Sequence, residues 1–290
     1  MALGIIEQLA HCSVRIETTL KSGGAACGTG FFMNFLQTDT EAIPAIITNK
    51  HVIANSESGK FHLTVAKPDG SPDLGNHQQF TLPNFESLWI QHPDDDVDLA
   101  AFLIGPLLNQ VQQNGANLFF IPLQTSLIPS DVERQDLSTM EDVIMIGYPS
   151  GIWDAVNNLP VIRRGISATH PSIDWNGKTE FLTDIASFPG SSGSPVLLAN
   201  IGGYMDKKGN TYMGSHRIRL LGIHYAGAMH TATGEIKIVT APTSTTAIPF
   251  TQIPNNIGVA INSKRLLEFE SVISKLISGH ALPKSNPNQP

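Results

Sequence analysis

Short apolar runs, separated by turn-forming residues, recur along the whole chain and predict β-strands. In the first half they occupy residues 13–18, 29–33, 45–48, 62–65 and 99–104, and in the second half residues 143–149, 161–166, 178–183, 195–198 and 219–224. Gly, Pro, Asn and Asp lie between the runs, as the turns that join short strands require. The pattern therefore predicts an all-β protein.

The apolar pattern changes along the chain, and each change predicts a boundary. It loosens into Asn, Gln and Pro over residues 106–138, which predicts a connection between an N-terminal β domain (1–105) and a C-terminal one (139–262). A period of 3.6 residues then predicts a C-terminal helix over 263–279. The last residues, 280–290, cannot bury enough apolar area to order themselves, so we expect a mobile tail.

Composition and charge narrow the classes of partner. The 290 residues are 41% hydrophobic and 15% charged, which is typical of a globular protein. The net charge is −7 and no stretch concentrates Lys and Arg among aromatic residues, so we expect no nucleic-acid partner. An acidic surface repels anionic membranes, and no apolar segment approaches the ~18 residues needed to span a bilayer, so we expect no membrane partner.

The N-terminal segment and the two cysteines bear on cellular location. The opening residues lack a basic region, and Glu7 interrupts the apolar run too early for a signal peptide, so we expect a cytoplasmic protein. Cys12 and Cys27 are too few for a disulfide-stapled secreted scaffold, and we expect both to be reduced and buried. A bridge between them is geometrically possible, but their spacing does not imply one.

The strongest local signal is a serine set among glycines, in the segment FPGSSGSPV at residues 188–196. Gly190 can adopt backbone conformations closed to other residues. Such a turn can direct the backbone N–H groups of Gly190 and Ser192 at one point beside the Ser192 hydroxyl. Two donors at that point would hold the oxyanion of a tetrahedral intermediate, so Ser192 is the candidate nucleophile.

A serine hydroxyl needs a base to take its proton, and the base needs a carboxylate to orient it. His51 is the candidate base because it follows the apolar run IIT and a short polar turn, and so is displayed at a strand end. Asp98 is the candidate carboxylate because it stands directly before the apolar run LAAFLI. Its three neighbours, Asp94, Asp95 and Asp96, are better explained as a solvated acidic loop than as a cation site.

Five segments carry a family resemblance: GTGFF at 28–32, ITNKHV at 47–52, DLAAF at 98–102, IGYP at 146–149 and GSSGSP at 190–195. In this order they resemble trypsin-like serine peptidases. The nearest match is to bacterial glutamyl endopeptidases, with kinship to the high-temperature-requirement proteases. The resemblance implies two antiparallel six-stranded β-barrels of the chymotrypsin fold, with His51 and Asp98 on the first and Ser192 on the second. It also implies a serine endopeptidase that works through an acyl-enzyme.

Two features depart from the family: one concerns a disulfide and the other concerns activation. Val52 stands where many members have a cysteine after the catalytic histidine, so that disulfide is absent. No basic activation site stands out before Cys12, which favours constitutive activity, or control by another route, over zymogen cleavage.

The residues around the expected substrate pocket predict cleavage after Glu or Gln. A preference for Lys or Arg needs a carboxylate six residues before the serine, where this chain has Ala186. Ser187 and His224 can instead donate hydrogen bonds to a side-chain oxygen. With Ala226 and Gly227, they resemble the pocket of glutamyl endopeptidases and of picornavirus-type cysteine proteases. A histidine capped by a backbone carbonyl is the structural alternative.

Other interpretations remain open at the level of sequence. The protein could be a catalytically inactive pseudoprotease that captures peptides by strand addition, or an esterase with the same apparatus. Scattered histidines without metal-binding spacing predict no metal, and the chemistry needs no cofactor. Residues 200–216 and 228–256 are additional to what a compact member of the family needs. They are either tolerated surface insertions or loops that restrict substrates or bind partners. The expected partner is a protein or peptide substrate, and the sequence does not indicate an oligomeric state.

Overall fold

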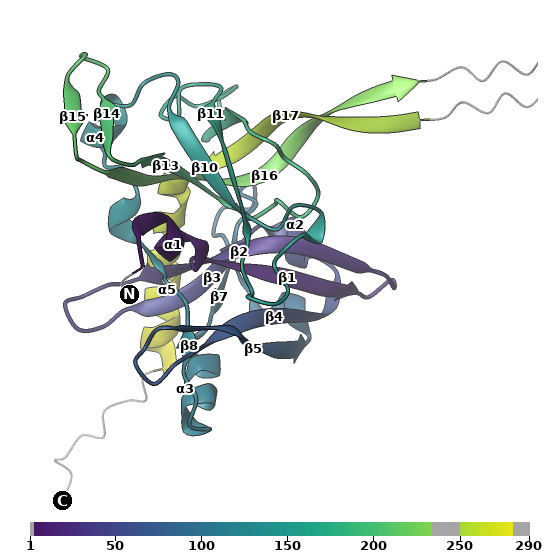
Figure 1. The fold of residues 1–290 in the computed structure, drawn as a ribbon. Helices are drawn as coiled ribbons and strands as arrows, with labels where there is room; N and C mark the ends of the chain where they lie inside the picture. The colour runs from purple at the N-terminus through teal and green to yellow at the C-terminus, as the bar shows by residue number, and fades with distance from the viewer. Residues whose placement is uncertain (1–2, 234–249, 281–290) are drawn as a thin grey trace, which may run out of the picture.

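The computed structural model describes residues 3–233 and 250–280, and it contains two β-rich halves followed by a helix (Figure 1). The first half is a sheet in the order β5-β4-β1-β2-β3-β7-β6, with β8 added beside β4 and β9 beside β2. Its strands are β1 (Ser13–Leu20), β2 (Ala25–Phe35), β3 (Ile43–Thr48), β4 (Ser56–Ala66), β5 (Pro72–Pro83), β6 (Ile90–Gln91), β7 (Ala100–Leu103), β8 (Leu118–Phe119) and β9 (Leu123–Gln124).

The second half is a closed barrel in the order β10-β11-β12-β17-β16-β13. Its strands are β10 (Asp142–Gly147), β11 (Val161–Ser167), β12 (Glu180–Asp184), β13 (Pro195–Asn200), β16 (Arg217–Thr233) and β17 (Phe250–Asn262). Buried apolar side chains from these strands, among them Met145, Phe181 and Val196, fill its interior. Alternation of inward apolar and outward polar residues is what lets short strands close in this way.

The expected pair of six-stranded barrels is therefore only partly present. The second barrel closes as predicted, but the first half is an open nine-stranded sheet whose end strands β5 and β6 do not pair in the described residues. Strand β6 has two residues, and it lies between the 3₁₀ turn Phe85–Leu88 and Pro93. A strand this short cannot pair along the twelve residues of β5.

Helices lie at the ends of the halves and between them. They are α1 (Ile5–Ala10), α2 (Lys50–Ile53), α3 (Gly105–Gln113), α4 (Asp131–Gln135) and α5 (Glu268–His280), with further 3₁₀ turns at Thr125–Leu127, Pro149–Gly151 and Ser263–Leu267. The connection over 106–138, which the sequence left irregular, thus holds two helices and two short strands. The C-terminal helix is present, and a 3₁₀ turn forms its first part.

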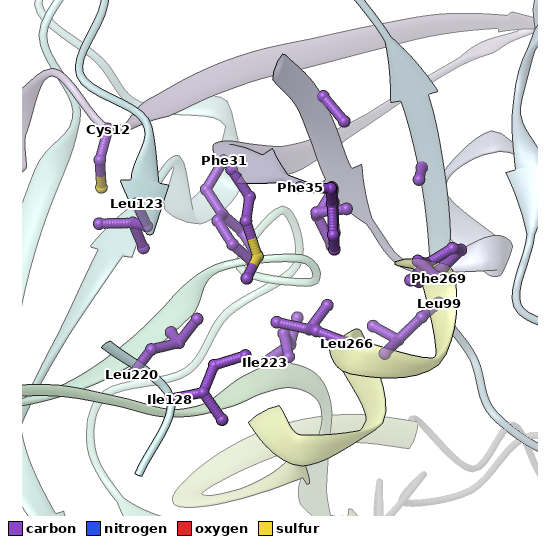
Figure 2. Close-up of a cluster of buried hydrophobic side chains, with 14 of the residues drawn as sticks. Cys12, Phe31, Phe35, Leu99, Leu123, Ile128, Leu220, Ile223, Leu266 and Phe269 are labelled. Atoms are coloured by element: carbon purple, nitrogen blue, oxygen red, sulfur yellow. The ribbon is translucent and has the colours of Figure 1, made fainter. Parts of the chain in front are cut away.

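One hydrophobic cluster joins the two halves (Figure 2). Phe31 and Phe35 of β2 contribute from the first half, and Leu220 and Ile223 of β16 from the second. Phe269 of α5 packs on the same cluster, with its ring centroid 6.1 Å from that of Phe35. Because both halves bury side chains in this one cluster, they pack against each other through a shared core.

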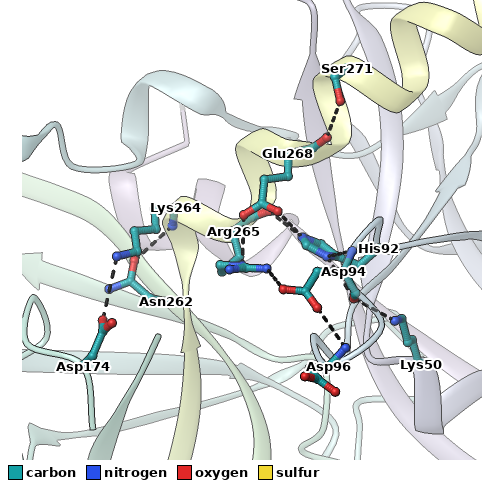
Figure 3. Close-up of polar contacts among 10 residues, drawn as sticks. All are labelled: Lys50, His92, Asp94, Asp96, Asp174, Asn262, Lys264, Arg265, Glu268 and Ser271. Carbon is teal, nitrogen blue, oxygen red and sulfur yellow. Dashed lines mark hydrogen bonds and ion pairs between the residues drawn. The ribbon is translucent and has the colours of Figure 1, made fainter. Parts of the chain in front are cut away.

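Polar contacts tie the last helix to the loop that carries Asp98 (Figure 3). Arg265 contacts Asp94 at 2.5 Å, and its backbone carbonyl oxygen lies 3.0 Å from Nε2 of His92. Lys50, beside His51, donates to the carbonyl oxygens of Asp94 and Asp95, each at 3.2 Å. The acidic run is therefore a structural loop, linked at one side to the helix and at the other to the neighbour of the candidate base.

The two predicted insertions differ from simple loops where they are described. Residues 200–216 contain a hairpin of β14 (Gly203–Met205) and β15 (Thr211–Met213), in which the rings of Tyr204 and Tyr212 stack at 4.8 Å. In the second insertion, β16 and β17 pair as far as Thr233 and Phe250 and extend away from the barrel (Figure 1). The segment TAPTSTTAIP at 240–249 and the predicted tail beyond His280 lie outside the described residues.

Cys12, directly before β1, and Cys27, in β2, are free thiols. Burial raises the pKa of Cys12 to about 12, while Cys27 is only partly buried. Among the described helices, none is long and apolar enough to cross a membrane. The cellular location expected from the sequence stays a prediction.

Candidate active site

The turn that carries Ser192 lies between β12 and β13 and has two glycines with positive φ. Gly190 has φ +88° and Gly193 has φ +87°, a region that side chains with a Cβ rarely adopt. A Cβ on Gly190 would lie 2.5 Å from the carbonyl oxygen of Tyr148, and a Cβ on Gly193 would overlap the carbonyl of Thr29. Both glycines are therefore required by backbone conformation and by close packing.

The same turn leaves two backbone donors unused. The N–H of Gly193 donates to the carbonyl of His224 at 2.8 Å, and the N–H of Ser194 donates to Ser191 at 3.0 Å. The N–H groups of Gly190 and Ser192 have no acceptor among the residues described. These are the two donors that the sequence assigned to an oxyanion hole, and they are free to serve one.

Thr29 of β2 anchors the turn to the first half of the molecule. Its N–H donates to the carbonyl of Ser192 at 2.9 Å, and its hydroxyl donates to the carbonyl of Gly190 at 2.8 Å. The hydroxyl oxygen also accepts from the N–H of Tyr148 at 3.1 Å. Thr29 is fully buried, so these bonds are shielded from water.

His51 and Asp98 form a close pair on the first half. The imidazole Nδ1 lies 2.5 Å from Oδ2 of Asp98, and the backbone N–H of His51 donates to Oδ1 at 3.0 Å. Asn49 donates from its side chain to the carbonyl of Asp98 at 2.7 Å. Because an ionised carboxylate only accepts, Nδ1 carries the proton and Nε2 is left as a base.

Ser192 lies in the second half, in a cavity that shares Tyr225 with the cavity lined by Asp98. Its hydroxyl donates to the carbonyl of Tyr225 at 3.3 Å, and Tyr225 and Asp98 line one cavity of about 450 Å³. Within the described residues there is no hydrogen bond between Ser192 and His51. A change of rotamer is the movement that turns a serine hydroxyl from one acceptor to another, and catalytic contacts often tighten only with substrate.

A second cavity, of about 250 Å³, opens beside Ser192. Ser187, His224, Ala226 and Gly227 all line it. The Ser187 hydroxyl and Nε2 of His224 lie 2.7 Å apart. A Cβ on Gly227 would lie 3.3 Å from that hydroxyl, so the glycine keeps the cavity open.

The His224 ring is neutral in the folded protein. Burial lowers its pKa to about 3, with smaller contributions from the positive charge of Arg163 and from His51. Its side chain is 2% exposed, and Nδ1 has no hydrogen-bond partner among the described residues. With the ring proton on Nε2, the neutral imidazole donates to the Ser187 oxygen, and the Ser187 hydroxyl is left to donate to a carboxyl or amide oxygen in the cavity.

A family model of the trypsin-like peptidase domain matches residues 28–202. This match covers more than half of the 290 residues, and it includes the His51–Asp98 pair and Ser192. The chain belongs to the trypsin-like peptidase family. A comparison with curated proteins finds no match.

Solved protease structures resemble this trypsin-like peptidase at low identity. The HtrA-type protease AlgW with a tripeptide has a TM-score of 0.48 and 18% identity, covering 94% of this chain and 63% of AlgW. Deg5 has a TM-score of 0.42 and 18% identity, covering 76% and 82%. The active form of the Rv3671c protease from M. tuberculosis has a TM-score of 0.41 and 15% identity, covering 96% and 84%. The chain thus spans less than two thirds of the AlgW chain that it matches.

Sequence reasoning about this trypsin-like peptidase missed two residues that shape the site. Thr29 lies in a segment that carried the family resemblance, but its role depends on a contact with Gly190 across 161 positions. Arg163 of β11 gave no signal, because it sits in an ordinary strand beside a second arginine. Its Nη1 donates to the carbonyl of Ala186 at 2.7 Å and to the hydroxyl of Ser191 at 2.8 Å.

The described part of the chain holds no group of three or more His, Cys, Asp or Glu side chains that could bind a metal. The acidic loop is explained by its own contacts instead. Asp94 accepts from Arg265 and from the N–H of Asp96, and these bonds hold its pKa below the usual range.

Proposed function

We propose that this trypsin-like peptidase is a serine endopeptidase that cleaves protein or peptide substrates after Glu or Gln. Two observations together carry the proposal: the His51–Asp98 pair in the first half and the turn around Ser192 in the second. The pair leaves Nε2 of His51 free, and the turn leaves two backbone donors beside Ser192 unused.

The reaction proceeds in two halves. Ser192 Oγ attacks the carbonyl carbon of the scissile peptide while its proton passes to Nε2 of His51. The N–H groups of Gly190 and Ser192 stabilise the negative oxygen of the tetrahedral intermediate. His51 then gives the proton to the leaving amine, and the C–N bond breaks to leave an acyl-enzyme. A water molecule, deprotonated by His51, hydrolyses the ester and restores Ser192. Asp98 holds the imidazolium in place throughout.

Substrate preference rests on the cavity beside Ser192. Its volume of about 250 Å³ accommodates a medium-sized side chain. Ser187 and His224, hydrogen-bonded to each other, together leave one donor for a side-chain oxygen, and Ala186 supplies no charge for a basic side chain. That donor suits the carboxylate of Glu and the amide oxygen of Gln alike, so it does not by itself choose between them.

An activity-based phosphonate probe tests the chemistry. We expect a diphenyl phosphonate with Glu or Gln next to phosphorus to label the wild-type enzyme, and Ser192→Ala to abolish the labelling. Ser194→Ala is the matched control, because this neighbouring serine should not react. Labelling that persists in Ser192→Ala would contradict the assigned nucleophile.

A randomised peptide library tests the specificity. We expect dominant cleavage after Glu or Gln, and loss of that preference in His224→Ala. His216→Ala, on the exposed hairpin, is the control and should leave the profile unchanged. Dominant cleavage after Lys, Arg or large apolar residues would defeat the specificity, while leaving the peptidase chemistry intact.

One observation favours a second candidate function, peptide binding without hydrolysis. The Ser192 hydroxyl donates to the carbonyl of Tyr225 and not to His51. An enzyme held in this state would capture peptides beside Ser192 without attacking them. Absence of labelling by the phosphonate, combined with measurable peptide binding, would support this alternative.

A further inference from the structure

Arg163 is a partly buried cation whose Nε and Nη2 are shielded from solvent, and most of its hydrogen-bonding capacity is unused. Guanidinium carries five N–H donors. The two on Nη1 bond to Ala186 and Ser191, but Nε and Nη2 are buried and have no partner among the described residues. Burial lowers the pKa of Arg163 to about 10, so the group is still charged at neutral pH.

No carboxylate compensates this charge within the described residues. Five other arginines each contact an acidic side chain; they are Arg15, Arg164, Arg217, Arg219 and Arg265. Arg134 has no ion pair, but Asp131 and Glu133 lie near enough to act on it. Arg163 has no such neighbour. Shielding a charge from water without an opposite charge beside it is unfavourable, which makes Arg163 a candidate for a functional role.

The position of Arg163 suggests what that function is. Its two bonds go to residues directly before Ser187 and Ser192, both of which line the cavity beside the nucleophile. It does not line the cavity itself. The guanidinium therefore lies behind the wall of the pocket, close enough to His224 for its charge to act on that ring.

We propose that Arg163 is a specificity-determining residue whose uncompensated charge makes the pocket prefer an acidic side chain, Glu, over the neutral Gln. The inference rests on the proposed cleavage after Glu or Gln and decides between the two. The Ser187 hydroxyl, hydrogen-bonded to His224, binds the side-chain oxygen directly, and Arg163 acts through the pocket wall as the counter-charge.

The physical basis is the difference between one charge and none. Glu and Gln have nearly the same shape, so the hydrogen bond from Ser187 discriminates weakly between them. A carboxylate entering a pocket of low dielectric constant loses its hydration, and a fixed cation behind the wall offsets that loss. The amide of Gln gains little from the same cation.

The test compares two peptide substrates that differ only in Glu or Gln at the cleaved position. We expect the wild-type enzyme to have a higher kcat/KM for the Glu peptide. In Arg163→Met, the Glu-to-Gln ratio of kcat/KM should fall about tenfold, which is the size expected for a single partly screened charge. Most of the change should appear in KM for the Glu peptide, and the Gln peptide should be affected less.

Two variants separate charge from packing. Arg163→Lys retains the charge and should preserve the ratio, whereas Arg163→Gln retains a donor for the pocket wall but not the charge and should lower the ratio like Met. Arg164→Met is the matched control: this neighbour on β11 is 73% exposed and pairs with Asp142 at 3.3 Å, so the ratio should not change.

The outcomes distinguish this inference from the function on which it rests. An unchanged ratio in Arg163→Met, or an equal loss for both peptides, would overturn the role of the charge while leaving cleavage after Glu or Gln in place. A wild-type enzyme that cleaves neither peptide, but cleaves after other residues, would instead overturn the proposed specificity. Should the Arg163 variants not fold, a wild-type preference for Gln over Glu would by itself refute the inference.

Discussion

The two halves of the molecule offer the proposed chemistry two different environments. His51, after the end of β3, and Asp98, before the start of β7, have side chains that are 48% and 24% exposed. Ser187 and His224 lie in the closed barrel, where they are 7% and 2% exposed. A general base that exchanges protons with substrate and water needs access to both, whereas recognition of a carboxyl group gains strength from the exclusion of water.

The halves also differ in how their functional residues are held. In the first half, the backbone N–H of His51 donates to the Asp98 carboxylate and the buried Asn49 side chain donates to the Asp98 carbonyl, so two donors only two residues apart hold Asp98. In the second half, the nucleophile turn depends on a residue from the other half, because Thr29 bonds to both Gly190 and Ser192. The comparison predicts that substitutions near Asp98 impair the function of His51. It also predicts that substitutions between the two halves, such as at Thr29, impair the turn that carries Ser192.

Substitution of Ser192 or His51, the residues between which the proton is proposed to pass, should have the largest effect on activity. Ser192→Ala and His51→Ala should each lower kcat/KM by roughly 10⁴- to 10⁶-fold, because neither residue can act without the other. The double variant should lose little more than the single variants. Steady-state assays of all three with one fluorogenic peptide provide the test, and losses that multiply would show that the residues do not work as a unit.

The second largest loss of activity is expected from a substitution in the first half, at Asp98. Asp98→Asn should leave the melting temperature nearly unchanged but lower kcat by roughly 10⁴-fold, because the amide would favour the wrong imidazole tautomer. Asp95→Asn, in the same acidic loop, is the control and should keep full activity. A large loss in Asp95→Asn together with an active Asp98→Asn would reassign the carboxylate.

A substitution at Thr29, where the two halves meet, should lower activity less. Its effect should fall on the Ser192 turn of the second half. Thr29→Val keeps the shape but removes the bond to Gly190 and the acceptor for Tyr148, so the oxyanion donors lose their support. We expect kcat to fall about tenfold to a hundredfold and the free energy of unfolding to fall by about 1–3 kcal/mol.

Thr18→Val is the matched control for this change. Thr18 of β1 is also buried, but its hydroxyl has no hydrogen-bond partner among the described residues. Its replacement should leave kcat unchanged and stability equal or higher. Equal kcat values for the two valine variants would show that Thr29 does not support the nucleophile turn.

The sequence predicted those features that are marked by residues close together along the chain, and it did not predict those that depend on contacts between distant residues. The positive φ of Gly190 and the pairing of His51 with Asp98 were expected because each has a nearby pattern: a glycine-flanked serine, a strand end, a strand start. The open first sheet was not expected, because closure depends on whether β5 meets β6 in space. Arg163 was missed for the same reason, since its missing counter-charge is visible only when the neighbours of the folded guanidinium are known.

The last expected effect concerns the buried half and leaves the rate unchanged, because it appears only in the dependence of stability on pH. His224 has an ordinary pKa of 6.5 when unfolded, and burial lowers the value to about 3 in the folded protein. Between these two values the unfolded chain binds a proton that the folded protein does not. Stability from this group is therefore lost as the pH falls from 6.5 toward 3, by up to about 1.4 kcal/mol per pH unit.

Other groups also titrate in this range, so the test is a difference between variants. Urea unfolding of the wild type, His224→Gln and His216→Gln at pH 4, 5, 6 and 7 gives the slope of stability against pH for each. We expect the slope to be shallower in His224→Gln, because glutamine does not titrate, and unchanged in His216→Gln, whose histidine lies on the exposed hairpin. Parallel slopes for the wild type and His224→Gln would mean that His224 takes up a proton in the folded protein over the same pH range as in the unfolded chain. The pocket would then carry its own positive charge, and the contrast between an exposed base and a dry, neutral recognition site would not hold.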